Sequence, residues 1–71
     1  MEKTFFCSLF KRTIKVKFES PFIVFSFIYP NNEDEFYDFY IEDWKEMKPH
    51  FIQKSWVTEE MVIFINDHVQ P

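Results

Sequence analysis

Hydrophobic and polar residues alternate along the first part of the chain in the manner of β-strands. Apolar residues occupy every second position from Ile14 to Phe18 within residues 13–19, which leaves one side of a strand facing water. Residues 4–10 are rich in types that favour strands, and residues 22–29 are apolar on both sides apart from one serine. The pattern predicts a three-stranded antiparallel meander over residues 4–10, 13–19 and 22–29.

Residues 33–48 follow a pattern that fits two different structures. In a helix, Asn32 is a suitable N-cap, most aromatic residues share one side with carboxylates opposite, and Pro49 ends the segment. In a strand, apolar and polar residues alternate over residues 36–42. Phe39, which would lie among the carboxylates in a helix, then falls on the apolar side. The sequence favours a helix over residues 33–48, and a fourth strand of the meander over residues 36–42 is the alternative.

A second helix is predicted over residues 59–69. Thr58 is a good N-cap, and Glu59 and Glu60 follow in the first turn, where carboxylates complement the positive end of the helix dipole. The β-branched residues of this segment leave a strand open as the alternative. The expected fold is therefore one small α+β domain over residues 1–71, with the meander followed by two helices.

Composition argues against several classes of function. The chain has 71 residues, no glycine and a single cysteine, so it lacks glycine-rich phosphate loops and cannot form an internal disulfide. Two histidines and one cysteine do not make a zinc site, and the carboxylates crowd one element rather than facing each other across a cleft. We expect no enzymatic activity, no metal and no cofactor, and a core built from aromatic packing.

The sequence gives no indication of membrane insertion. The longest apolar run, residues 22–29, is much shorter than the about 20 residues that a helix needs to cross a bilayer. The short apolar run near the start is followed by Lys11 and Arg12 without a small-residue cleavage site. We therefore expect a cytoplasmic protein with no membrane partner.

Charge is unevenly distributed along the chain. Residues 1–30 carry three more bases than acids, whereas residues 31–71 carry seven more acids than bases, for a net charge of −4. The stretch from Glu33 to Glu46 places seven carboxylates among aromatic residues with a single base. In a helix it would carry about one carboxylate per 3 Å, which is close to the ~3.4 Å between charges along one DNA strand.

This acidic and aromatic segment is the candidate binding surface. We expect a small non-enzymatic protein that inhibits or regulates a larger protein with a basic cleft. A virus-encoded inhibitor of a host defence or nucleic-acid-handling complex, acting by nucleic-acid charge mimicry, fits this description. The predicted partner-binding residues are Glu35, Asp38, Glu42, Asp43, Glu46, Tyr37, Tyr40 and Trp44.

Two further hypotheses use other segments. Because residues 22–29 are apolar on both sides, they could join copies of the chain in a homodimer or a larger assembly, with the acids only keeping it in solution. The predicted interface residues are Phe22, Val24, Phe25 and Phe27. Residues 11–17 could instead bind nucleic acid through Lys11, Arg12, Lys15 and Lys17, although the acidic chain as a whole argues against this.

Overall fold

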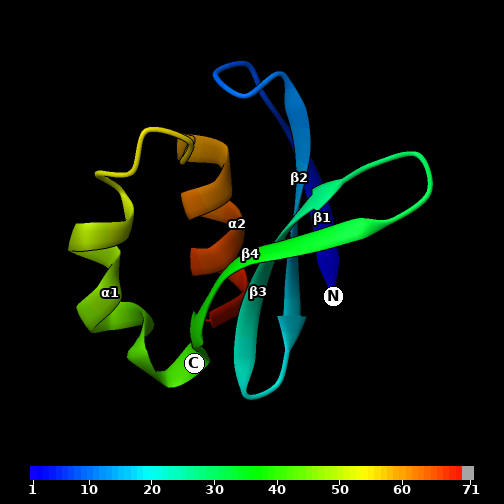
Figure 1. Ribbon diagram of the computed structural model, residues 1–71. Coiled ribbons are helices and arrows are strands. Elements are labelled where there is room, and N and C mark those ends of the chain that lie inside the picture. The colour runs from blue at the N-terminus through cyan, green and yellow to red at the C-terminus, as the bar shows by residue number, and fades with distance from the viewer. Residues whose placement is uncertain (70–71) are drawn as a thin grey trace.

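The computed structural model describes residues 1–69 and shows a four-stranded antiparallel sheet followed by two helices. The strands pair in chain order, β1-β2-β3-β4, as a simple meander. Both helices lie on the same side of the sheet, and among residues 1–69 no helix covers the other side (Figure 1). The elements are β1 (Glu2–Cys7), β2 (Arg12–Glu19), β3 (Phe22–Ile28), β4 (Glu33–Tyr40), the short 3₁₀ helix η1 (Ile41–Asp43), α1 (Trp44–Phe51) and α2 (Glu59–Val69).

The α+β fold is confirmed, in its four-stranded form. The first three strands lie close to the predicted ranges, and the alternative strand over residues 36–42 corresponds to β4. The helix predicted over residues 33–48 is replaced by β4, η1 and α1. Pro49 does not end this helix as predicted but lies inside α1, which stops two residues later at Phe51. Its missing N–H removes one backbone hydrogen bond, consistent with so short a helix.

A bulge in β4 explains why its pattern is ambiguous in the sequence. Phe25 pairs with Tyr37, but the next residue of β3, Ser26, pairs with Glu35, so Phe36 is an extra residue. Phe36 and Tyr37 therefore both contribute to the helix-covered side, where each contacts an aromatic ring of β3. The bulge interrupts the strict alternation of a strand, and the local helix signals in the sequence are overridden by pairing with β3.

The core lies between the sheet and the helices and consists largely of aromatic rings. Phe25 of β3 and Phe51 of α1 are fully buried, with their ring centroids 5.3 Å apart. Tyr37, Phe39 and Trp56 surround this pair, each with its centroid within 6.4 Å of both rings. Burying one large apolar side chain contributes about 1.5–3 kcal/mol, so this cluster can stabilise a small domain that has no disulfide.

Helix α2 forms as its sequence predicts. The backbone N–H of Met61 donates to Thr58 Oγ1 at 3.3 Å, which is the expected N-cap contact. Met61, Phe64 and Ile65 are buried against the sheet, which accounts for the apolar stripe of this helix. Within residues 1–69, no helix is both long enough and apolar enough to cross a membrane.

Candidate functional site

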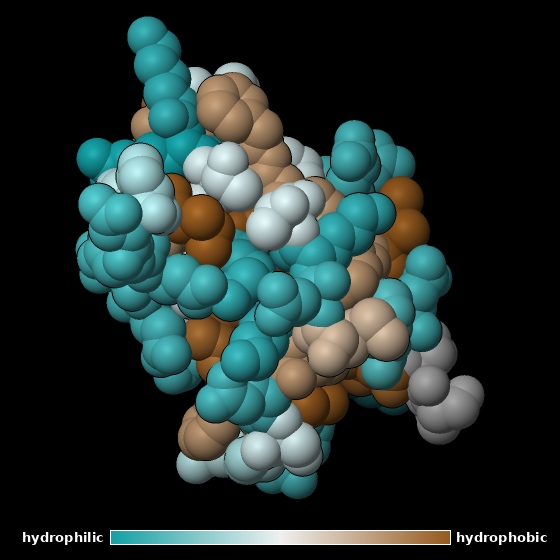
Figure 2. Space-filling model, turned by 90° about the vertical axis from the view of Figure 1, so that its right-hand side faces the viewer, coloured by the Kyte–Doolittle hydropathy of each residue, from teal (hydrophilic) through white to brown (hydrophobic). Residues whose placement is uncertain are grey.

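The strand register places a mixed set of side chains on the helix-free side of the sheet, which we call the open face. Residues that pair across neighbouring strands point to the same side, so the open face can be followed from β1 to β4. Figure 2 shows the molecule from this side: hydrophilic residues cover most of it, and hydrophobic ones lie between them in small separate areas. The charged and aromatic residues of the open face are Glu2, Phe6, Lys15, Lys17, Glu19, Phe22, Glu33, Glu35, Asp38 and Tyr40.

Carboxylates outnumber ammonium groups on the open face, and the two lysines are already paired. Lys15 Nζ lies 2.7 Å from Glu33 and 3.9 Å from Glu2, and only 11% of its side chain is exposed. The hydrogen bond to Glu33 raises the pKa of Lys15 above its ordinary value, with nearby carboxylates adding to the effect and burial opposing it. Lys17 lies 3.3 Å from Glu19. Lys15 and Lys17 of β2 are therefore both paired with acids of the same face.

Among the residues that the structure describes, the carboxylates of Glu35 and Asp38 have no such neutralising partner. Both residues are exposed on β4, and neither forms a salt bridge within residues 1–69. They share the open face because the bulge at Phe36 shifts the alternation between them. The β4 side of the open face is consequently negative.

An aromatic pair lies beside these carboxylates, at the end of the sheet next to η1. Phe22 and Tyr40 are register partners, and their rings stack with centroids 4.7 Å apart. Tyr40 is 47% exposed even though it is part of the sheet. An aromatic surface of this kind is a common anchor for a protein partner, because it offers a large contact area with little conformational freedom to lose.

The predicted partner-binding residues are divided between three places. Glu35, Asp38 and Tyr40 lie on the open face, whereas Glu42, Asp43 and Glu46 lie on η1 and α1. Trp44 is buried in the core, and Tyr37 is partly buried and packs against it. Lys54 Nζ lies 4.7 Å from the ring centroid of Tyr37, and burial, followed by the charge of Asp38, raises the pKa of Tyr37. The acidic segment is thus not one continuous surface.

The predicted oligomer interface does not form one surface either. Phe25 is fully buried beneath the helices and cannot contact a second copy of the chain. Phe27 lies on the same side, stacked on Phe36 at 4.0 Å between centroids. Only Phe22 and Val24 belong to the open face, and Val24 is itself buried by its neighbours. One side of residues 22–29 is apolar because it packs in the core, whereas on the other side Val24 is buried by its neighbours and Phe22 stays partly exposed.

The predicted nucleic-acid-binding bases are dispersed as well. Arg12 packs between the rings of Phe27 and Tyr29, at 5.6 Å and 5.3 Å from their centroids, and donates a hydrogen bond to the Tyr29 hydroxyl. Lys11 lies in the β1–β2 turn with a φ of 53°. Because Lys15 and Lys17 are paired with carboxylates, these bases do not make a positive surface.

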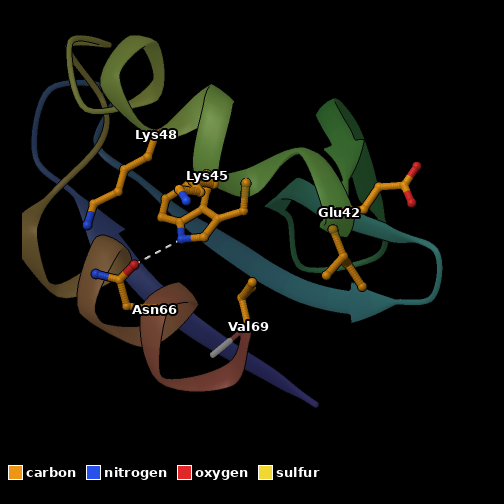
Figure 3. A pocket seen from close by; sticks show the side chains of 7 residues that line it. Glu42, Lys45, Lys48, Asn66 and Val69 are labelled. Atoms are coloured by element: carbon orange, nitrogen blue, oxygen red, sulfur yellow. Dashed lines mark hydrogen bonds between the residues drawn. The ribbon is translucent and has the colours of Figure 1, made fainter. Parts of the chain in front are cut away.

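A cleft between the two helices was not expected from the sequence. It has a volume of about 630 Å³, and Figure 3 shows it from close by. Trp44 Nε1 donates to Asn66 Oδ1 across the cleft at 2.9 Å. Its lining residues are Ile41, Glu42, Trp44, Lys45, Lys48, Asn66 and Val69. The sequence signal for this contact is a buried indole, which needs an acceptor, but the sequence alone does not indicate which residue supplies one.

In the part of the chain that the structure describes, no group of three or more acidic, histidine or cysteine side chains is placed to hold a metal ion. Comparisons with protein families, curated proteins and solved structures gave no match.

Proposed function

We propose that the chain is a small non-enzymatic binding protein that docks through its open face on a basic surface of a larger protein and thereby inhibits or regulates it. The observation that carries the proposal is the position of Glu35 and Asp38. Two unpaired carboxylates lie on a sheet face without a helix, beside the stacked pair of Phe22 and Tyr40. Charge and an aromatic anchor therefore occur together on one accessible surface.

The two features would contribute differently to binding. Exposed ion pairs are worth only about 0.2–1 kcal/mol each, so Glu35 and Asp38 would mainly speed and orient the encounter with a basic partner. Tyr40, which is partly exposed and held by Phe22, would supply apolar contact area and hence affinity. We expect Tyr40→Ala to increase the dissociation rate, and charge reversal to reduce the association rate.

An enzyme or complex that handles nucleic acid is a suitable partner, because such proteins have basic clefts. A virus-encoded inhibitor of a host defence would be one example. The spacing of the carboxylates on β4 bears on whether such an inhibitor would imitate the charges of nucleic acid. Carboxylates at alternate positions of a strand are about 6.6 Å apart along its axis, roughly twice the ~3.4 Å charge spacing along a DNA strand. We therefore favour blockage of a basic cleft over imitation of each phosphate charge.

The test is affinity capture of partners from the organism that encodes the chain, with two variants of equal net charge. One carries Glu35→Lys and Asp38→Lys on the open face. The other carries Glu46→Lys and Asp67→Lys on the exposed sides of α1 and α2. A partner that meets the open face is retained by the wild type and by the helix variant and is lost from the open-face variant.

Two outcomes would contradict the proposal. Equal loss from both variants would mean that only total charge matters, and retention by both would mean that another surface binds. The captured protein should also dissociate as salt is raised from about 50 to 500 mM, because exposed charges are screened over roughly 10 Å at 0.1 M ionic strength. Binding to labelled single-stranded DNA at low salt would instead favour the nucleic-acid hypothesis.

A further inference from the structure

The cleft between α1 and α2 has an asymmetric polar arrangement. The indole N–H of Trp44 can only donate a hydrogen bond, so the side-chain oxygen of Asn66, rather than its nitrogen, must face it. The amide nitrogen of Asn66 is therefore turned away from Trp44, toward the side of the cleft where the Lys48 ammonium lies (Figure 3). The buried indole thus holds a hydrogen-bond donor in a fixed orientation.

The charges that line this cleft are mainly positive, although the chain as a whole is acidic. Lys48 is half-buried and Lys45 lies one turn before it on α1, and neither has a carboxylate within salt-bridge distance in residues 1–69. Glu42 is the acidic residue of the lining, and its carboxylate points away from Lys48 (Figure 3). Within residues 1–69, Lys48 Nζ and the amide nitrogen of Asn66 are therefore two donors on the same side of the cleft without a carboxylate partner.

The rest of the lining suits an apolar group. Ile41, Trp44 and Val69 line the cleft together with the polar side chains. Its volume of about 630 Å³ falls within the roughly 300–1,000 Å³ that is usual for small-molecule sites. A few convergent polar groups beside a mainly apolar wall are the usual arrangement of such sites.

From these contacts we propose that the cleft binds a small organic carboxylate. The carboxylate accepts hydrogen bonds from Lys48 Nζ and from the amide nitrogen of Asn66, and the apolar body of the ligand lies against Ile41 and Val69, which are partly exposed. The site is separate from the open face, so it does not depend on the proposed docking function. It would allow a metabolite to bind while a protein partner occupies the other side of the sheet.

The test uses octanoate as the probe and octanamide, a neutral molecule of the same chain length, as its control. Binding is followed by ¹H–¹⁵N NMR of the full chain, on the Trp44 indole and the Asn66 side-chain amide. The second tryptophan signal is assigned with Trp56→Phe. Octanoate should shift the Trp44 and Asn66 signals to saturation, because only octanoate brings a negative charge to Lys48. We expect about tenfold higher affinity than for octanamide, which corresponds to about 1.4 kcal/mol.

Variants at one position separate a charge-specific site from a general apolar surface. Lys48→Gln should remove the preference for octanoate over octanamide, and Lys48→Arg should keep most of it. The matched control is Lys54→Gln, because Lys54 lies over Tyr37 outside the cleft, and it should leave octanoate affinity unchanged. The open-face variant with Glu35→Lys and Asp38→Lys should also bind octanoate normally, which keeps this test independent of the docking proposal.

Three results would overturn the proposal. Octanoate and octanamide could bind with equal affinity, Lys48→Gln could keep the preference, or the shifts could centre on other apolar residues, such as exposed Phe6 and Leu9 near the β1–β2 turn. If Lys48→Gln fails to fold, as judged by the dispersion of its own spectrum, the comparison of the two probes on the wild-type chain still decides the question.

Discussion

The two sides of the sheet are built in opposite ways, although they share the same strands. On the helix-covered side, Phe25 is enclosed by four aromatic rings and is fully buried. On the open face, its neighbours Val24 and Ser26 are buried only by side chains of adjacent strands, among them paired and unpaired charges. The first side holds the fold together. We expect the second to contribute less to stability, because fewer large apolar side chains are fully buried there.

The largest expected difference between the two sides is in how much stability is lost when one aromatic ring is removed. Phe51→Ala leaves a cavity next to Phe25 and should lower the free energy of unfolding by about 3–5 kcal/mol. Phe22→Ala on the open face removes a stacked pair worth about 0.5–1.5 kcal/mol and some partly exposed area, and should lower the free energy of unfolding by less than Phe51→Ala does. Urea denaturation followed by circular dichroism measures both values. Similar losses would mean that the open face is part of the structural core.

Removing a polar contact of the helical layer should have an intermediate effect. Asn66→Ala leaves the buried Trp44 N–H without its acceptor, which should cost about 1–3 kcal/mol. Asn31→Ala, in the exposed β3–β4 turn, is the control and should change stability very little. A negligible effect of Asn66→Ala on urea denaturation would show that water replaces the amide at the indole.

The pH dependence of stability gives a smaller effect that involves one group from each side. The folded pKa values of Lys15 and of Tyr37 are raised above their ordinary values of 10.5 and 10.0. Each group binds its proton more tightly in the folded chain, so its contribution is complete at lower pH and is lost as pH rises through the folded pKa. Stability should therefore decline above about pH 10.

Two variants assign this alkaline decline to its groups. Glu33→Gln removes the main cause of the Lys15 shift and should make the decline shallower, at a cost of about 0.2–1 kcal/mol at neutral pH because Glu33 is half-exposed. Tyr37→Phe should remove the part of the alkaline decline that the ionisation of Tyr37 causes. Thermal unfolding measured from pH 7 to 11 provides the comparison, and curves parallel to that of the wild type would refute the assignment.

The smallest effect should come from the open-face carboxylates themselves. The variant with Glu35→Lys and Asp38→Lys should change the free energy of unfolding by no more than about 0.5 kcal/mol, as is usual for exposed sites without specific contacts. The same variant should lose the captured protein partner. Urea denaturation of this variant and of the wild type measures the difference. A decrease of several kcal/mol in the free energy of unfolding would mean that these charges stabilise the fold.

Local signals were sufficient for part of the structure. The alternation from Ile14 to Phe18 predicted β2, and the cap at Thr58 with its following glutamates predicted α2 over residues 59–69. These features could be predicted because each rests on contacts between residues close together in the sequence. The open-face carboxylates Glu35 and Asp38 were also among the predicted binding residues, since a local excess of charge is visible in the sequence.

The tertiary structure decided the rest. Residues 33–40 have the charges and the N-cap of a helix, but they form β4 because β3 offers an edge to pair with and Phe25 and Phe27 offer rings to cover. The same pairing divides the acidic segment between the open face, the core, and η1 with α1. The contact of Trp44 with Asn66 joins residues that lie 22 positions apart.

The sequence by itself determined which segments are amphipathic and where charge accumulates, because these depend on near neighbours. Which side chains meet depended on strand pairing and burial between distant residues, and only the folded chain settles that.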